Sequence, residues 1–276
     1  DTEVVAWLDV DEYQEERYQS IPRHFLMQKY QYRWPWSIPQ AASAFRQVVE
    51  SFRPDIIEIH TPTVAWVVAW ANLQIPYVHV LHGYGEITRI KSVKDRIIRF
   101  TNRFVQYRLK SDFIVVSPAM ASVAANYFAI PTSHFHPVPN GVDLVKFSTK
   151  QQKANHCPTI LMVGTLSSNK GQALGIKAIN EILKHKPNVK LKIVGDGPDR
   201  KWLECLVKDM SLENNVEFTG RREDIPHIMS QSDLLWQLSE SEGLPLVVIE
   251  AMAIGLPVVG FNVRGIHDVV IHGETG

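Results

Sequence analysis

Residues 241–259 read SEGLPLVVIEAMAIGLPVV and pass from a loop through a helix into a strand. Pro245 suits the first turn of a helix, where its missing N–H would be unpaired in any case, and Gly255 suits the position just after a helix. The stretch therefore predicts a helix between these two residues, followed by a strand. The free amides of Leu246 and Val247 would lie at the start of that helix, a position that favours a phosphate group.

Two glutamates of this stretch are candidates for ligand binding. Glu250 falls within an apolar run, where a carboxylate is costly to bury without partners, and the two hydroxyls of a ribose would satisfy it. Glu242, on the loop before the helix, could likewise hold sugar hydroxyls. The alternative is a solvated Glu242 and a Glu250 that bonds to nearby backbone.

The rest of the chain repeats this alternation. Short runs rich in Val, Ile and Leu are separated by stretches of helical period, a pattern typical of parallel strands that are covered on both faces. In the first half we expect strands over 4–8, 56–60, 77–82, 113–117 and 135–138, and helices over 40–52, 64–73, 93–109 and 118–128. In the second half we expect strands over 159–163, 190–194, 216–218, 234–238 and 257–261, and helices over 172–184, 198–210, 225–230 and 246–253. The sequence therefore predicts an α/β protein with two Rossmann-like, doubly wound domains that face a central cleft, the expected ligand site.

The boundary between the two domains is predicted by composition. A turn-forming cluster at 138–143 is followed by a polar stretch at 148–156. We therefore expect an N-terminal acceptor-side domain over 1–147 and a C-terminal donor-binding domain over 148–276.

Charge and cysteine content narrow the function classes. The 29 basic and 29 acidic side chains cancel, which leaves no overall field for nucleic acid, so no nucleic-acid partner is expected. Cys157 and Cys205 are too few for a disulfide framework, which suits the cytoplasm. The longest apolar runs fall short of the roughly 20 residues that span a bilayer, although contact with the inner face of a membrane stays open.

Two further loops follow predicted strands. In residues 160–171, ILMVGTLSSNKG, Gly164 would let a ligand approach the backbone, and Lys170 would bring a positive charge to balance a leaving diphosphate. A solvated lysine is the ordinary alternative. Residues 191–198, LKIVGDGP, lack the full glycine pattern of an NAD site, so Gly195 is interpreted as part of a tight turn that faces a nucleotide.

Taken in order, these segments resemble family 4 of the retaining glycosyltransferases over nearly the whole chain. The most specific part is the pair Glu242 and Glu250, followed by Ala-Met-Ala. The resemblance implies a GT-B fold and a nucleoside-diphosphate sugar donor, such as a UDP- or GDP-sugar. From the sequence itself we expect no metal or other cofactor to be required. It also implies transfer with retention at the anomeric carbon to a glycan, a lipid-linked acceptor or another acceptor.

The resemblance also assigns roles to residues. Lys170 would bind the diphosphate, Glu242 the sugar and Glu250 the ribose. His82, in the segment VLHG, matches the position of a histidine near the sugar, although a strand-end residue bonded to backbone is an equally good interpretation. The implied catalytic residues are His82, Lys170 and Glu242. The implied donor-binding residues are Gly164, Thr165, Lys170, Gly195, Glu242, Gly243, Leu244, Leu246, Val247 and Glu250.

The chain departs from the family pattern in two places. An arginine is common at the position of Thr165, so Lys170 would balance the diphosphate with one cation fewer, or another residue must contribute. The chain opens just before what looks like the second strand of the family and stops where relatives continue, so we expect both ends to be incomplete.

Two segments of the first half allow more than one interpretation. Residues 89–110 combine apolar side chains at helical spacing with many cations, which suits an anionic membrane surface or an ordinary half-solvated helix. Residues 13–36 could form an acceptor loop or an irregular surface. For the whole chain, a sugar-nucleotide epimerase, a phosphorylase or a non-catalytic sugar-nucleotide-binding protein are the alternatives to a transferase.

Overall fold

The computed structural model describes residues 4–9, 23–28, 36–84, 87, 92–148 and 157–276. The chain forms two compact units, of which the first contains Asp1–His82 and Glu86–Pro137 and the second Gly83–Gly85 and Val138–Gly276. The sheets of both units are parallel, which confirms the predicted α/β class.

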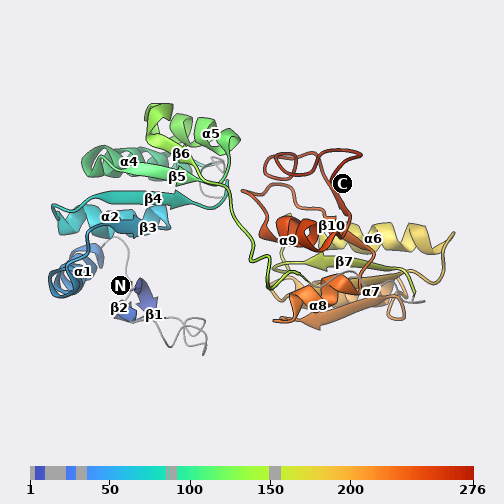
Figure 1. Ribbon diagram of the computed structural model, residues 1–276. Helices are drawn as coiled ribbons and strands as arrows, with labels where there is room; N and C mark the ends of the chain where they lie inside the picture. Colours follow the sequence, from blue (N-terminus) through green and yellow to red (C-terminus); the bar gives the residue numbers. More distant parts are fainter. Residues whose placement is uncertain (1–3, 10–22, 29–35, 85–86, 88–91, 149–156) are drawn as a thin grey trace. The chain divides into compact units, whose positions relative to one another are not determined.

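The second unit, coloured from yellow-green to red in Figure 1, is built on a five-stranded sheet in the order β11-β10-β7-β8-β9. Its strands are β7 (Thr159–Val163), β8 (Lys190–Val194), β9 (Val216–Gly220), β10 (Leu234–Gln237) and β11 (Val258–Gly260). Its helices are α6 (Gln172–Leu183), α7 (Arg200–Asp209), α8 (Ile225–Ser230) and α9 (Leu246–Ile254), with a 3₁₀ turn η5 (Ser168–Lys170). Every predicted helix and strand of this half is present, with its ends within two residues of the prediction.

The strand order makes β7 and β10 neighbours, with Leu234 opposite Ile160. From β7 the chain proceeds to β8 and β9 on one side, and from β10 it proceeds to β11 on the other. The carboxyl ends of β7 and β10 therefore form the topological switch point of the sheet, where open α/β folds bind their ligands.

Apolar side chains cover both faces of this sheet. Ile176, Ile179 and Leu203, from α6 and α7, pack in one buried cluster with alternate residues of β7 and β8. Val248 and Ala251, from α9, pack in a second cluster on the other residues of the strands. Burial of each large aliphatic side chain stabilises the fold by about 1.5–3 kcal/mol, so this sheet is a rigid base for the loops at its edge.

The first unit contains a four-stranded sheet in the order β3-β4-β5-β6 and a separate pair, β1-β2. The strands are β1 (Val4–Asp9), β2 (Arg23–Gln28), β3 (Ile57–Ile59), β4 (Tyr77–Leu81), β5 (Asp112–Val115) and β6 (Phe135–Pro137). The helices are α1 (Ile38–Phe52), α2 (Pro62–Ala71), α4 (Val93–Leu109) and α5 (Pro118–Phe128), with a 3₁₀ turn η4 (Thr132–His134). Since right-handed crossovers join neighbouring strands in succession, α2, α4 and α5 cover the same face of the sheet, and α2 and α5 both contact α4.

The expectation for residues 13–36 is corrected in part. Arg23–Gln28, which we expected to be loop or irregular surface, forms β2 and pairs in parallel with β1, with Val4 opposite Arg23. The apolar part of this strand is only Phe-Leu-Met, too short to stand out from a loop by periodicity. Residues 10–22 and 29–35 lie outside the described residues.

The segment between the units packs with the second. The Asn140 side-chain amide donates to the carbonyl oxygen of Leu244 at 2.8 Å, and Phe147 is buried beside Val248. The contacts divide the chain after Pro137, whereas the sequence predicts a boundary after residue 147.

Candidate functional site

Lys170 and Glu242 meet at the switch point of the second unit. The Lys170 Nζ lies 2.7 Å from Glu242 Oε1, although the two residues are 72 positions apart. The lysine side chain is 29% exposed and the glutamate 12%, so the pair is largely shielded from water without being sealed. The two residues that the sequence assigned to diphosphate and sugar are therefore in direct contact.

The loops that carry this pair are fixed to each other through backbone. The Glu240 amide donates to the carbonyl oxygen of Asn169 at 3.0 Å. Gly171 follows η5 with φ of 77°, and a Cβ at this position would collide with the carbonyl oxygen of Leu238. Only glycine therefore allows the loop after β7 to lie this close to the end of β10, and that approach brings Lys170 to Glu242.

Gln237 is a buried residue of this site that the sequence analysis missed. Its side-chain amide donates to Glu242 Oε1 and to Ser239 Oγ, both at 2.9 Å. Gln237 and Lys170 therefore both hold the Oε1 atom of the Glu242 carboxylate. The available signal is a polar residue that ends an apolar strand at the switch point, since a buried amide must find partners.

The loops after β7 and β8 lie against each other. The Leu166 amide donates to the carbonyl oxygen of Asp196 at 3.0 Å. Gly195 has φ of 134°, and a Cβ there would collide with the carbonyl oxygen of Gly164. A Cβ at Gly164 would meet nothing within 4 Å, so open space lies beside that backbone, as a ligand approach requires. Thr165 is exposed, and its carbonyl oxygen accepts from Gln172.

Helix α9 begins at Leu246, as predicted, with Pro245 at its N-cap and no side chain capping its first turn. Gly243 and Leu244, just before it, are buried, whereas Leu246 is exposed and Val247 half-buried. The helix is apolar all round apart from Glu250, and Val248 and Ala251 pack it against β10 and β11.

Glu250 is half-buried on α9. Burial raises the pKa of its carboxyl group above the ordinary value, and the nearby Lys146 opposes this shift. Among the residues that the structure describes, no hydrogen bond or ion pair to the Glu250 carboxylate is found. A half-buried carboxylate without such a bond destabilises the fold slightly, and a ligand with hydroxyl donors would relieve that cost.

His82 belongs to the first unit, just after β4, and contacts His60 there. The His60 Nδ1 and His82 Nε2 atoms are 2.8 Å apart, and the two rings are stacked at 5.2 Å between centroids. Glu58 lies on the other side of His60, 3.5 Å from its Nε2. Burial, then His60, lowers the pKa of His82 and so favours its neutral form, while Glu58 opposes this shift. His60 was not predicted; the signal is a Glu-x-His pattern at the end of a strand next to β4.

The second unit therefore gathers the predicted donor-binding residues into three neighbouring loop ends and the start of α9. Lys170 and Glu242 touch, Gly164 and Gly195 touch, and Leu244 is bonded to the segment that leads into the unit. His82 belongs to the first unit. In the described part of the chain, no group of three or more His, Cys, Asp or Glu could hold a metal ion. Nor does that part contain a helix long and apolar enough to cross a membrane.

Two α/β units with parallel sheets form an architecture that many nucleotide-binding enzymes share. Comparison with known families agrees. The model described as Glycosyltransferase Family 4 matches residues 2–146, and the model described as Glycosyl transferases group 1 matches residues 146–276. The chain belongs to these glycosyltransferases of GT-B fold.

Individual relatives of the chain are also glycosyltransferases. An uncharacterized glycosyltransferase of Haemophilus influenzae is 29% identical over 84% of this chain and 64% of its own length. The Escherichia coli UDP-Gal:alpha-D-GlcNAc-diphosphoundecaprenol alpha-1,3-galactosyltransferase is 30% identical over 68% of this chain and 52% of its own. The chain thus spans between about half and two thirds of these two curated relatives.

Among solved structures, Anabaena HepE in complex with UDP and glucose is 26% identical, with a TM-score of 0.76 over 92% of this chain and 71% of that chain. The Staphylococcus aureus TarM structure, at 19% identity and a TM-score of 0.72, shares the fold over 86% of this chain and 48% of its own.

Proposed function

We propose that this protein transfers a sugar, with retention of anomeric configuration, from a nucleoside-diphosphate sugar to a glycan or lipid-linked acceptor. The observation that carries the proposal is the Lys170–Glu242 pair at the switch point, held by Gln237. Family membership supports transfer as the reaction. The relatives favour a UDP-sugar, because the E. coli name includes UDP-Gal and the HepE structure holds UDP and glucose.

The second unit would bind the donor. A lysine ammonium has three N–H donors, and Glu242 occupies one of them, so two remain for phosphate oxygens. As the glycosidic bond breaks, negative charge grows on the leaving diphosphate, and Lys170 with the amides of Leu246 and Val247 would stabilise it. The remaining oxygen of Glu242 would accept from a sugar hydroxyl, and Glu250 would accept from the ribose.

The first unit would bind the acceptor, and the neutral His82 would donate or accept a hydrogen bond near the sugar. No residue of the donor loops is an evident nucleophile for a double displacement. We therefore favour departure and attack on the same face of the sugar, assisted by the leaving phosphate. A cytoplasmic location, with contact to the inner face of the membrane through residues 89–110, would suit a lipid-linked acceptor.

A donor and acceptor panel tests the proposal. A thermal-shift screen of UDP-, GDP- and ADP-sugars identifies the donor, since a ligand at about 100 times its dissociation constant stabilises the folded state by about 2.7 kcal/mol. The selected donor is then incubated with glycan and lipid-linked acceptors, and NMR of the product gives the configuration of the new linkage. We expect nucleoside diphosphate release that depends on acceptor, and a product with the donor's anomeric configuration.

The same assay separates the alternatives. An epimerase would convert the donor without acceptor, a phosphorylase would require inorganic phosphate, and a binding protein would bind nucleotide without turnover. An inverted product would contradict retention while leaving transfer intact.

A further inference from the structure

Helix α4 of the first unit buries polar side chains as well as apolar ones. Its buried face includes Asn102 and Gln106, which are 6% and 2% exposed. Trp66 Nε1 donates to Asn102 Oδ1 at 3.3 Å, and the Gln106 amide donates to His79 Nε2 at 3.1 Å. These bonds satisfy the polar groups inside the unit, and Val105 and Leu109 supply the apolar contacts of α4 with the core.

Five other large apolar side chains of α4 point outward. They recur at alternating spacings of four and three residues, which keeps them on one side of the helix. We call this set the apolar stripe: Val93, Ile97, Phe100, Phe104 and Tyr107, each between 57% and 79% exposed. The stripe is about 21 Å long at 1.5 Å per residue, and in the described part of the chain nothing covers it.

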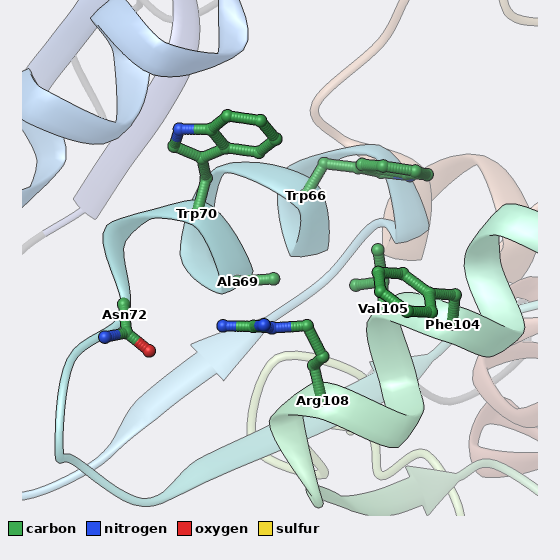
Figure 2. Close-up of a pocket in the computed structure, with 7 residues that line it drawn as sticks. All are labelled: Trp66, Ala69, Trp70, Asn72, Phe104, Val105 and Arg108. Carbon is green, nitrogen blue, oxygen red and sulfur yellow. The ribbon is translucent and has the colours of Figure 1, made fainter.

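A pocket extends the stripe onto α2. It has a volume of about 360 Å³ and is lined by Trp66, Ala69, Trp70, Asn72, Phe104, Val105 and Arg108. Figure 2 shows the Arg108 guanidinium reaching from α4 beneath Ala69 toward Asn72, with Trp66 and Trp70 along the α2 side. Trp70 is 58% exposed, so an aromatic ring from a second helix continues the apolar surface.

The charge around the stripe is of one sign. Between Ser92 and Lys110 the only acid is Asp95, and its carboxylate is engaged in the capping box with Ser92. At 100° per residue, the exposed Arg96 and Arg108 lie about 60° to either side of the stripe. Cations therefore border the apolar surface along both edges.

The cations nearer the protein have a different role. Arg99 and Arg103 both donate to the carbonyl oxygens of Asn126 and Tyr127, near the end of α5. They fix α4 to the unit, which leaves Arg96 and Arg108 as the cations that border the outer face.

We propose that the apolar stripe and the adjoining pocket form a docking surface for an anionic lipid bilayer. A stripe of aromatic and aliphatic side chains with an arginine at each edge suits a helix that lies in a membrane interface, with rings at the level of the headgroups and cations against anionic lipid. Residues 89–91 lie outside the described residues, so the surface is assigned to 92–110 and α2.

A bilayer fits this surface better than a second copy of the chain. Two copies that pair through the stripe would bring the Arg96 and Arg108 edges against like charges, which opposes association. A specific protein interface also needs about 800 Å² on each partner, whereas each ring of a narrow stripe enters a bilayer independently. This inference deepens the membrane contact of the proposed function and names its surface.

Vesicle flotation tests the surface directly. The purified protein is mixed with vesicles of phosphatidylcholine alone or with about 30% phosphatidylglycerol, which supplies the negative surface potential that cations sense. We expect binding to the anionic vesicles only, and salt should weaken it. Phe100→Ser with Tyr107→Ser should reduce binding by about tenfold or more, and Arg96→Gln with Arg108→Gln by a similar factor. Neither pair removes a buried group, so melting temperatures should hold.

Trp202→Ser is the matched control, because Trp202 is 55% exposed on α7 of the second unit and should not affect vesicle binding. Equal binding by the wild type and the Phe100→Ser, Tyr107→Ser variant would overturn the proposal, as would no binding to anionic vesicles. Self-association that disappears in this variant would assign the stripe to a second copy instead and would also overturn it. Binding of UDP, measured on the same samples, reports on the proposed function separately.

Discussion

Helix α4 of the first unit and helix α9 of the second both place polar side chains against apolar surroundings, and they differ in what those side chains contact. Asn102 and Gln106 on α4 are buried and bonded to four neighbouring side chains. Glu250 on α9 is half-buried, and among the described residues no hydrogen bond or ion pair reaches its carboxylate. The polar groups of α4 therefore serve the fold, whereas Glu250 is a group that a ligand would satisfy.

Asn102 and Gln106 are therefore residues of the fold, whereas Glu250 is a candidate ligand-binding residue, although all three are polar residues of a helix. If this distinction is right, substitutions of Asn102 or Gln106 on α4 should change stability and leave nucleotide affinity intact. Substitutions at the switch point and on α9 should change nucleotide affinity and leave stability nearly intact.

The largest expected effect is on turnover. Lys170→Ala should slow transfer by about 10² to 10³-fold, because it removes a charge that is most effective as the leaving diphosphate becomes negative. Sugar-nucleotide affinity should fall less, since the diphosphate is less charged before the bond breaks. Single-turnover rates and calorimetric affinities measure the two effects separately.

Lys192→Ala is the control for this experiment. Lys192 is 28% exposed and lies 3.6 Å from Glu217, so it resembles Lys170 in burial and pairing but belongs to β8. Equal turnover by Lys170→Ala and Lys192→Ala would remove Lys170 from the mechanism.

The next effect is on the stability of the first unit. Gln106→Leu should lower the free energy of unfolding by about 2–3 kcal/mol, because it leaves the His79 ring nitrogen and the Ser111 hydroxyl buried without this partner. Denaturant titration measures the loss. Gln47→Leu, at an exposed position of α1, should be nearly neutral. A neutral result for Gln106→Leu would mean that the α4 network does not hold the fold.

A pH effect of smaller size should come from the same network. Burial lowers the pKa of His79 from its ordinary 6.5 to about 3. Below pH 6.5 the unfolded chain binds a proton that the folded unit excludes, so stability is present above this pH and is lost as pH falls toward 3. Between pH 7 and pH 5 the loss should be about 2 kcal/mol. His79→Gln should flatten this part of the pH profile, and an unchanged slope would contradict the assignment.

The sequence predicted the second unit more completely than the first for a physical reason. Its strands are buried on both faces and read as continuous apolar runs, and glycine or proline marks several helix ends, as at Gly255. The sequence does not reveal the order of the strands in the sheet. Lys170 and Glu242 were each placed after a strand, but their contact depends on β7 and β10 being neighbours, and Gln237 gained its role only through that contact.

The first unit shows where periodicity stops being informative. Helix α4 has the bounds that the sequence predicts, 93–109, because its period is clear. Period alone does not say which face of a helix is buried. Asn102 and Gln106 point inward because partners from β4, α2 and α5 surround them, and those partners are distant in sequence. β2 was missed because three apolar residues carry little signal.

The smallest expected effect concerns Glu250 and tests the comparison most directly. Glu250→Gln keeps the size of the side chain and removes its charge. Because burial raises the pKa of the Glu250 carboxyl, its charged form destabilises the fold at pH 7, and the neutral amide should leave stability unchanged or raise it by less than about 1 kcal/mol. If the carboxylate accepts from a ribose, the same variant should bind UDP about tenfold more weakly, since a hydrogen bond to a charged acceptor is replaced by one to a neutral amide.

Titration with 2′-deoxy-UDP identifies the contact: the wild type should prefer UDP over the deoxy analogue, and Glu250→Gln should have lost most of that preference. Glu217→Gln, on the exposed end of the β8–β9 pair, should retain it. A Glu250→Gln protein that melts well below the wild type, and discriminates between the two nucleotides as the wild type does, would place Glu250 with Asn102 and Gln106 as a residue of the fold.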